Sequence, residues 1–306
     1  MQNLNLILDT DVGADCDDMV AIAYLIYAKR NFGLNLKAIT HSNGAGVAGI
    51  SAIADVFKFY EEEIPLIGEE QGKFVNDGNS YAYAVAKKFG SYNKFLPAVK
   101  VLRKTLAEND HVTICAIGPF TNIANLLKSE PDEYSDLNGV QLVAKKCDRL
   151  VIMAGRFDEQ YSEWNVKVDV ESSKNMVKLC PVPIIFLPFE VGENMISGGK
   201  IMKSKGESNP VALSLLAMPY GDVVKMGGRH SWDPATAIYA VEGEKDFFEL
   251  SNAGTVTIDD KAVSTFTEDK NGKHYILNLK RKDGKTDAEL KKAVADYIDD
   301  CLDTLR

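Results

Sequence analysis

Five aspartates lie within ten positions near the N-terminus, directly behind a short apolar run. In the segment LDTDVGADCDD they are Asp9, Asp11, Asp15, Asp17 and Asp18. The segment joins an expected strand over 4–8 to an expected helix over 19–28. Carboxylates this close repel one another, and some take up protons unless a cation or hydrogen bonds compensate. A hard divalent metal ion is the simplest compensation, so the loop is predicted to bind a metal or to carry out acid–base chemistry.

A helix dipole explains part of this cluster. Asp17 and Asp18 suit the first turn of a helix, where negative side chains are stabilised by the dipole. Asp9 and Asp11 alternate at the end of the expected strand and are not explained in this way. Because unpaired buried charge is costly, the metal or catalytic interpretation is preferred. Asp15 keeps two interpretations, a partner lying behind the metal ligands or a helix cap.

The elements that would position these residues follow an alternating pattern. Apolar runs of strand length occur at 4–8, 35–40, 112–117, 149–154 and 183–187. Segments of helical periodicity separate most of them, which predicts an α/β fold with a doubly wound, mostly parallel sheet. In such sheets the functional loops lie at the carboxyl ends of the strands. The polar residues that follow these runs are therefore expected to meet in one pocket.

The C-terminal part has a different character. Residues 251–281 alternate polar and apolar side chains around DDK and NG turn signals, which predicts antiparallel hairpins. The residues from Asp287 onward form an amphipathic pattern that predicts a terminal helix. Because the chain contains no repeat, low-complexity tract or Pro/Gly-rich linker, residues 1–306 are predicted to form one domain.

Composition excludes several classes of function. The chain has 306 residues, 45% of them apolar, and a formal net charge of −9. Mixed charge of this sign does not suit a nucleic acid partner. The cysteines are odd in number and contain no C-x-x-C pair, which argues against a disulfide framework or a structural zinc site. No run is long enough to span a membrane and no signal segment precedes the first strand, so a cytoplasmic location is predicted.

Several motifs together resemble the nucleoside hydrolases, the inosine-uridine-preferring N-ribohydrolase family. LDTDVGADCDDMVAI resembles the family's DTDPGxDD signature, with valine in place of proline and two extra residues before the final Asp-Asp. Four further segments resemble family motifs in the family's order: ITHSNGAG (39–46), AIGPFTNIANLL (116–127), SEWNVKVD (162–169) and HSWDPATAI (230–238). The resemblance implies one nucleoside hydrolase-like domain that cleaves ribonucleosides to free base and ribose.

The resemblance also implies roles for individual residues. A calcium ion would be bound by Asp11, Asp18, Asp233 and the backbone carbonyl of Ile117, since calcium accepts six to eight oxygens without strict geometry. Asp11 would also act as the general base that deprotonates the attacking water. Ribose hydroxyls would be bound by Asp17, Asn43, Glu163 and Asn165. Relatives are commonly homodimers or homotetramers, and the partner implied is a small nucleoside.

Two departures from the family leave the favoured base open. Many relatives have a histidine, thought to protonate the departing base, where this chain has Trp232; tryptophan instead suits a stacking wall. His230 is a possible substitute acid, although an incidental loop position is the more ordinary explanation. Between Met153 and Glu163, where relatives have an asparagine that contacts the sugar, this chain reads AGRFDEQYSE. Arg156 in this segment could contact a 5′-phosphate or simply pair with Asp158 or Glu159. His41, beside Asn43 at the expected pocket rim, suggests no role.

Two other classes of function compete. A nucleoside- or ribose-binding protein could keep the metal pocket without turnover, although a base facing water would then have little use. A haloacid dehalogenase-type phosphatase would use Asp9 as nucleophile and Asp11 as acid in a DxDxT motif. That match fails at Gly13, where threonine or valine is expected. Release of ribose from nucleosides, or of phosphate from phosphomonoesters, distinguishes the three.

Overall fold

The computed structural model describes residues 4–42, 45–70, 80–281 and 284–305, and within them the main sheet has eleven strands. Its central strands all run parallel. In spatial order they are β13 (His274–Leu279), β7 (Ile184–Leu187), β6 (Cys147–Met153), β5 (Val112–Ala116), β1 (Asn5–Thr10), β2 (Asn35–His41), β3 (Leu66–Glu69) and β4 (Leu96–Pro97). The predicted α/β fold with a mostly parallel sheet is confirmed.

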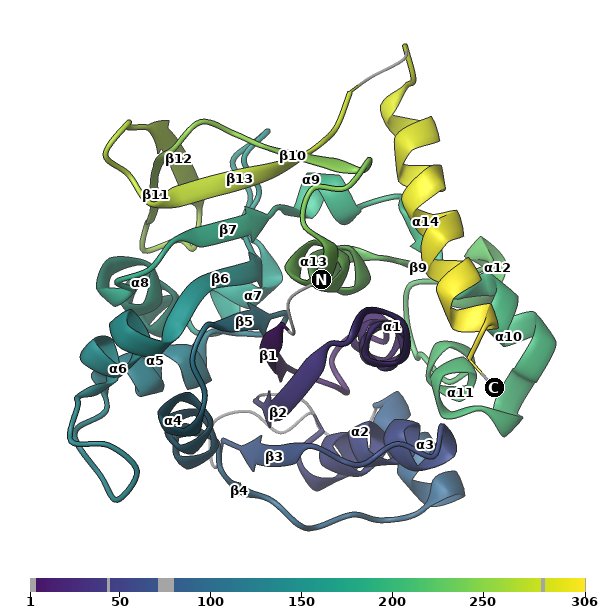
Figure 1. Cartoon of the computed structure of the whole chain (residues 1–306). Coiled ribbons are helices and arrows are strands. Elements are labelled where there is room, and N and C mark those ends of the chain that lie inside the picture. The colour runs from purple at the N-terminus through teal and green to yellow at the C-terminus, as the bar shows by residue number, and fades with distance from the viewer. Residues whose placement is uncertain (1–3, 43–44, 71–79, 282–283, 306) are drawn as a thin grey trace.

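Helices cover both faces of this sheet (Figure 1). One face carries α4 (Ala98–Glu108), α5 (Thr121–Lys128), α6 (Gly139–Lys146) and α8 (Val170–Leu179). The other face carries α1 (Asp17–Phe32), α2 (Val47–Phe59), α3 (Tyr81–Phe89), α10 (Gly199–Lys205), α11 (Pro210–Leu216), α13 (Trp232–Glu242) and α14 (Asp287–Asp303). Short turns are α7 (Trp164–Val168), α9 (Phe189–Gly192), α12 (Val223–Met226) and η1 (Gly206–Ser208).

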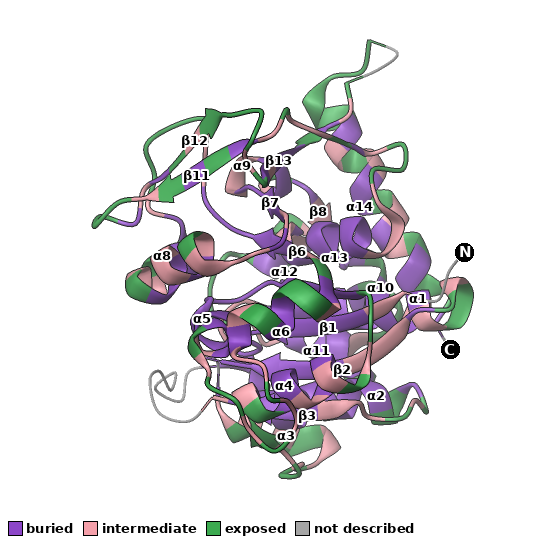
Figure 2. Cartoon of the chain, turned by 60° about the vertical axis from the view of Figure 1, so that its left-hand side comes forward, coloured by how far each residue is buried: buried purple, intermediate pink, exposed green. Residues whose placement is uncertain are grey.

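The first strand shows why both faces need cover. Leu6 and Leu8 pack into the apolar core on one side of the sheet, and Ile7 packs into the core on the other side. All three side chains are fully buried. Successive side chains of a strand point to opposite faces, so a continuous apolar run indicates a strand covered on both sides. Figure 2 shows this burial along the central strands, in contrast to the exposed residues around β11 (Gly254–Ile258) and β12 (Ser264–Glu268).

One hairpin of the C-terminal region is confirmed and a second is not. β11 (Gly254–Ile258) and β12 (Ser264–Glu268) pair antiparallel around the DDK turn. Beyond the NG turn, β13 does not continue as a hairpin with β12; it pairs parallel with β7 and is in antiparallel register with β11 at one pair, Gly254 and His274. β10 (Phe248–Leu250) then pairs antiparallel with β13. The apolar residues of β13 are buried against the main sheet, and this burial outweighed the local turn signal.

Element boundaries mostly follow the sequence pattern. The five expected strands are present, and the terminal helix begins at Asp287 as predicted. α1 begins at Asp17, earlier than expected, so Asp17 and Asp18 belong to its first turn. β3 and β4 were not predicted: β4 has only two residues, and the short apolar run of β3 is interrupted by Gly68. No helix among the described residues has the length and apolarity needed to cross a lipid bilayer.

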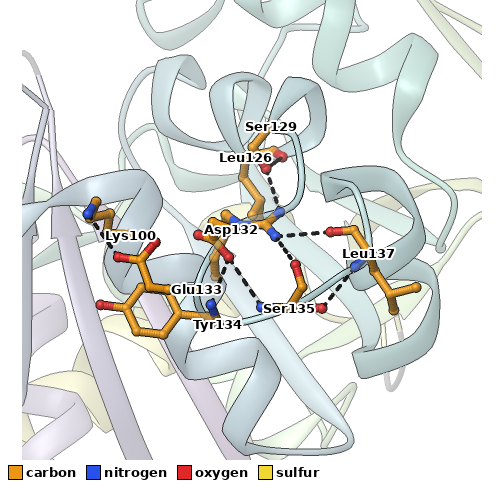
Figure 3. A network of polar contacts seen from close by, with 9 residues as sticks. Lys100, Leu126, Ser129, Asp132, Glu133, Tyr134, Ser135 and Leu137 are labelled. Carbon is orange, nitrogen blue, oxygen red and sulfur yellow. Dashed lines mark hydrogen bonds and ion pairs between the residues drawn. The ribbon is translucent and has the colours of Figure 1, made fainter.

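A buried arginine fixes the loop between α5 and α6, away from the strand ends that carry the aspartates. Arg103 Nε lies 2.7 Å from Asp132 Oδ2. Its Nη2 donates to the backbone carbonyls of Ser135 at 3.0 Å and Leu137 at 2.9 Å. Figure 3 shows these acceptors gathered with Ser129 around one point. Arginine suits this task because its planar guanidinium can donate to several acceptors at once.

Candidate active site

A cavity of about 590 Å³ opens at the carboxyl ends of β1, β5, β6 and β7. It is lined by Asp11, Ala14, Asp15, Asp17, Asp18, Ile117, Met153, Glu163, Trp164, Asn165, Val168, Phe189, Tyr220, Arg229, Trp232 and Asp233. The pocket therefore lies where it was expected, at the carboxyl ends of the parallel strands. Every residue predicted for the site lines it except Asn43, which lies outside the described residues.

Carboxylates form the floor of this cavity. Oxygens of Asp17, Asp18 and Asp233 lie within 4.8 Å of one another, and all three side chains are buried. The backbone N–H of Asp233 donates to Asp17 Oδ2 at 3.1 Å, which joins the start of α13 to the start of α1. The backbone N–H of Asp11 donates to Asp18 Oδ1 at 3.3 Å. Residues more than 200 positions apart are thus brought to one acidic cluster.

The structure differs in one detail from the ligand set that the resemblance implied. The tight group contains Asp17, which was assigned to the sugar, together with Asp18 and Asp233. Asp11, assigned to the metal, lines the same cavity beside this group. The hydrogen bond from its backbone N–H to Asp18 Oδ1 shows that Asp11 is adjacent to the group.

The protonation of these carboxyls depends strongly on burial. Desolvation, followed by repulsion from neighbouring aspartates, raises the pKa of Asp11, Asp17 and Asp233 well above the usual value. Desolvation also raises the pKa of Asp18 to about 7, although the hydroxyl of Thr10 donates to it and opposes the shift. A bound cation would reverse both causes, because it attracts the charged form and replaces lost hydration.

Two unpartnered oxygens make the fit to a cation specific. Asp11 Oδ2 and Asp18 Oδ2 are buried and have no hydrogen-bond partner among the described residues. Buried polar atoms are normally satisfied, and an unsatisfied one requires an explanation such as an absent ion. Several carboxylate oxygens around one point are the donor set of a hard divalent cation. The described residues therefore fit a metal of this class.

Ile117 and Asn165 meet at the edge of the acidic cluster. Asn165 Nδ2 donates to the Ile117 carbonyl at 3.1 Å and to the Met153 carbonyl at 3.2 Å. A carbonyl oxygen has two lone pairs, so Ile117 can accept this bond and still contact a cation. Both donors of the Asn165 amide are used, whereas no described residue donates to its Oδ1. This oxygen is free to accept a hydrogen bond from a hydroxyl group of a ligand.

Glu163 also has a structural role as a helix cap, which the sequence analysis did not predict. It is the N-cap of α7, where Oε1 accepts from the Asn165 N–H at 2.8 Å. Its Oε2 accepts from the N–H groups of Gly155 and Val166, each at 3.2 Å. Burial raises the pKa of Glu163 to about 7, although these backbone hydrogen bonds oppose the shift. Glu163 lines the cavity and also fixes the turn that presents Asn165.

Asp15 pairs with an arginine that the sequence analysis did not select. Arg229 Nε donates to Asp15 Oδ1 at 2.8 Å, and Arg229 Nη2 forms an ion pair with Asp15 Oδ2. The backbone N–H of Cys16 also donates to Asp15 Oδ1, at 2.7 Å. Arg229 lies on β9 (Arg229–His230), which pairs with β8 (Ile196–Ser197). In the sequence, the only sign that Arg229 belongs to the site is its position four residues before Asp233.

Tyrosines fix the backbone of the first loop. Tyr81 Oη accepts from the Gly13 N–H at 2.8 Å and donates to the Asp15 carbonyl at 2.7 Å. Tyr220 Oη donates to the Ala14 carbonyl. Gly13 has φ of 112°, a conformation that L side chains rarely adopt. These contacts hold a loop whose charges would otherwise drive it apart.

His41 lies beneath the first loop and not at the pocket rim where it was expected. Its side chain is fully buried, with Nδ1 2.7 Å from Glu69 Oε2 and Nε2 3.0 Å from the Val12 carbonyl. Both partners are acceptors, so both ring nitrogens donate and the ring is an imidazolium. Burial alone would lower the pKa of His41, but the hydrogen bond and charge of Glu69 outweigh it and raise that pKa.

We expect His41→Ala to lower the free energy of unfolding by about 3 kcal/mol, because it leaves the mostly buried Glu69 carboxylate without its partner. Urea denaturation followed by circular dichroism measures this loss. His111→Ala is the matched control, since the side chains of His111 and its partner Asp148 are 84% and 54% exposed. Equal stability of the two variants would contradict the assigned role of His41.

Aromatic rings form another part of the cavity lining. The Trp232 and Phe189 rings lie 5.0 Å apart, and Trp232 Nε1 donates to the Phe189 carbonyl at 2.8 Å. Trp164 also lines the cavity, and 53% of its surface is exposed. Flat rings of this kind can stack against a heterocyclic base. The indole N–H of Trp232 is already used, so Trp232 is a wall and not a donor.

His230, considered as a substitute acid, and Arg156, considered as a phosphate contact, do not line the cavity. His230 Nδ1 accepts from the Asn194 N–H at 2.8 Å, and burial together with Arg229 lowers the pKa of His230. Arg156 Nε lies 2.7 Å from Asp158, and its Nη1 lies 2.9 Å from Glu159. Of the alternatives for Arg156, the pairing with neighbouring acids is the one observed.

Comparison with known proteins adds an independent line of evidence. The family model "Inosine-uridine preferring nucleoside hydrolase" matches residues 6–296. The chain is similar to the pyrimidine-specific ribonucleoside hydrolase RihA of Enterobacter sp. (strain 638), with 28% identity over 268 residues, covering 79% of this chain and 80% of that protein. RihA of Salmonella arizonae is 27% identical over 229 residues, covering 68% of each chain.

A solved structure extends the similarity to the fold. The inosine-uridine preferring nucleoside hydrolase from Bacillus anthracis superposes with a TM-score of 0.65 and 13% sequence identity. The match covers 96% of this chain and 99% of that chain. At this identity the superposition shows a shared fold and does not transfer individual residue roles.

Proposed function

Because the chain belongs to the inosine-uridine preferring nucleoside hydrolase family, whose members are glycosyl hydrolases, we propose that it is a calcium-dependent ribonucleoside hydrolase. The reaction cleaves the N-glycosidic bond and gives free base and ribose. The observation that carries the proposal is the buried cluster of Asp17, Asp18 and Asp233 in the same cavity as Asp11. A cavity lined by both carboxylates and aromatic rings suits a sugar joined to a base.

Calcium is proposed from the family resemblance, and the donor set is compatible with it. Asp11, Asp18, Asp233 and the Ile117 carbonyl would hold the ion, and the position of Asp17 makes it a further candidate ligand. Calcium accepts many oxygen donors in flexible geometry, which suits ligands that come from separate loops. When bound, the ion supplies positive charge that lowers the pKa of a nearby water and orients it.

Asp11 is proposed as the general base. Its buried carboxylate lines the cavity, and its Oδ2 has no other partner among the described residues. It takes a proton from water as the water oxygen bonds to the anomeric carbon C1′ of the sugar. The positive charge that develops on the sugar in the transition state is stabilised by the surrounding carboxylates.

The sugar is oriented by the polar residues of the floor. Asp17 and Glu163 accept hydrogen bonds from ribose hydroxyls, and the free Oδ1 of Asn165 accepts another. Asn43 is proposed for the same task, although it lies outside the described residues. Hydrogen bonds that shorten as the sugar flattens lower the barrier further. The base stacks against Trp232, and because the curated relatives above are named as pyrimidine-specific, uridine and cytidine are the first substrates to test.

The proposal is tested by ribose release. Purified protein is incubated with uridine, cytidine, inosine and adenosine, with calcium or with a chelator, and reducing sugar is measured over time. Ribose that accumulates with calcium and not with chelator supports the proposal. Binding of nucleoside without product would instead indicate a binding protein. Phosphate release from phosphomonoesters, with no ribose release, would indicate the phosphatase alternative.

A further inference from the structure

Departure of the base requires positive charge or a proton on the base side of the cavity. When the bond between C1′ and the base nitrogen breaks, its electron pair remains on the base. Among the described lining residues, the Trp232 N–H donates to Phe189 and the Tyr220 hydroxyl donates to Ala14. His230 does not line the cavity. No described side chain on the base side is therefore a free acid.

Arg229 lines this part of the cavity with a fixed guanidinium. Its carbon Cζ lies 5.4 Å from the centre of the Trp232 ring, which is the proposed stacking wall. The paired contacts with Asp15 hold Nε and Nη2, whereas Nη1 has no acceptor among the described residues. Two bonds to one carboxylate fix the orientation of a guanidinium. The remaining donor and the charge are then available to a ligand.

The charge of Arg229 persists at every relevant pH. Burial alone would lower the pKa of this guanidinium, but the hydrogen bonds to Asp15 and the charges of Asp15 and Asp17 outweigh it and raise that pKa. Arg229 is therefore a cation that does not act as a proton donor. Among the described residues that line the cavity, it is the one basic side chain.

We propose that Arg229 stabilises the departing base as an anion, an inference that rests on the proposed hydrolysis of ribonucleosides. The C1′–N bond breaks with its electron pair going to the base, and the water oxygen bonds to C1′. One proton of the water passes to Asp11 and the other stays on the new hydroxyl. The base anion then takes a proton from solvent, and Asp11 returns its own proton to solvent.

This role selects a class of substrate. A base with ring oxo groups, such as uracil or hypoxanthine, spreads negative charge over oxygen and forms a stabilised anion. Cytosine, which has an amino group in place of one oxo group of uracil, forms a less stable anion and depends more on protonation. Without a free acid near the base, the enzyme is expected to favour uridine over cytidine.

The experiment compares two leaving groups in the same enzyme. Uridine requires help for its base to leave, whereas 4-nitrophenyl β-D-ribofuranoside releases a phenolate that is stable by itself. We expect Arg229→Met to lower kcat for uridine about 100-fold and to leave kcat for the nitrophenyl substrate nearly unchanged. Arg229→Gln keeps a polar group without charge and is expected to show the same selective loss, should the methionine variant fold poorly.

Arg156→Met is the matched control. Its guanidinium also lies over a ring of the aromatic wall, 5.2 Å from the Phe189 centre, but it does not line the cavity. This variant is expected to process both substrates as the unchanged enzyme does. An equal loss of kcat on both substrates in the Arg229 variants would indicate that Arg229 only holds the loop, and it would overturn the proposal. An unchanged kcat for uridine would also overturn it. An unchanged enzyme that releases ribose from neither substrate would overturn the proposed function itself.

Discussion

Replacing Asp11 by alanine is expected to lower kcat for ribonucleoside hydrolysis by about 10³- to 10⁴-fold while the chain stays folded. A positioned general base contributes up to this amount, and Asp11 is also a proposed ligand of the ion. The fold should persist because the buried carboxylate is destabilised by its neighbours, so its loss removes repulsion. Initial rates of ribose release at saturating substrate measure the effect.

Two controls accompany this variant. Near-ultraviolet circular dichroism and the melting temperature in chelator test whether Asp11→Ala keeps the native packing. Asp260→Ala removes a carboxylate whose side chain is 97% exposed and does not line the cavity, and it should leave the rate unchanged. Retention of more than a few per cent of the rate in Asp11→Ala would refute its role as base.

Removal of the metal is expected to abolish activity and to lower Tm by about 5 °C at pH 8. A ligand that binds only the native state at 100 times its Kd adds about 2.7 kcal/mol of stability. For a chain of this length, each kcal/mol of stability shifts Tm by about 2 °C, which gives a total shift of about 5 °C. Calcium added back after chelation should restore both activity and Tm. Full activity and an unchanged melting curve in chelator would remove the metal from the mechanism.

The effect of chelation should depend on pH in a defined direction. In the metal-free fold, burial raises the pKa of Asp18 to about 7 and raises those of Asp11, Asp17 and Asp233 in the same direction. Between about pH 4 and pH 7 the folded state then holds more protons than the unfolded state, so metal-free stability falls as pH rises. We expect a smaller loss of Tm on chelation at pH 5 than at pH 8.

Differential scanning calorimetry at the two pH values, with calcium and with chelator, measures this dependence. Protons and the cation neutralise the same carboxylates. The ion therefore adds most stability at pH 8, where fewer of these carboxylates carry a proton. The raised pKa of His41 makes its stabilisation greatest at low pH both with calcium and with chelator, so it cancels in the difference between the two Tm values. An equal difference in Tm at pH 5 and pH 8 would contradict the assigned electrostatics of the cluster.

Local patterns in the sequence were sufficient for five parallel strands of the sheet, β1, β2, β5, β6 and β7, and for the place of the site. The run from Leu6 to Leu8 is apolar on both sides, which specifies a strand covered by two layers of helices. The aspartates after it lie at the carboxyl end of that strand, where loops of parallel sheets meet. These inferences use only the spacing of neighbouring residues, and spacing is a local property of the chain.

The partners of individual side chains were decided by tertiary structure. Asp15 gave no local sign that it would pair with Arg229, and His41 gave none that it would bridge Glu69 and Val12. The strand β13 likewise followed the open edge of β7 and not its local turn signal. Such pairings depend on which surfaces packing brings within a few ångströms. Sequence alone therefore determined an acidic site in a parallel α/β fold, whereas tertiary packing decided which charges meet there, because attraction between side chains acts through space and not along the chain.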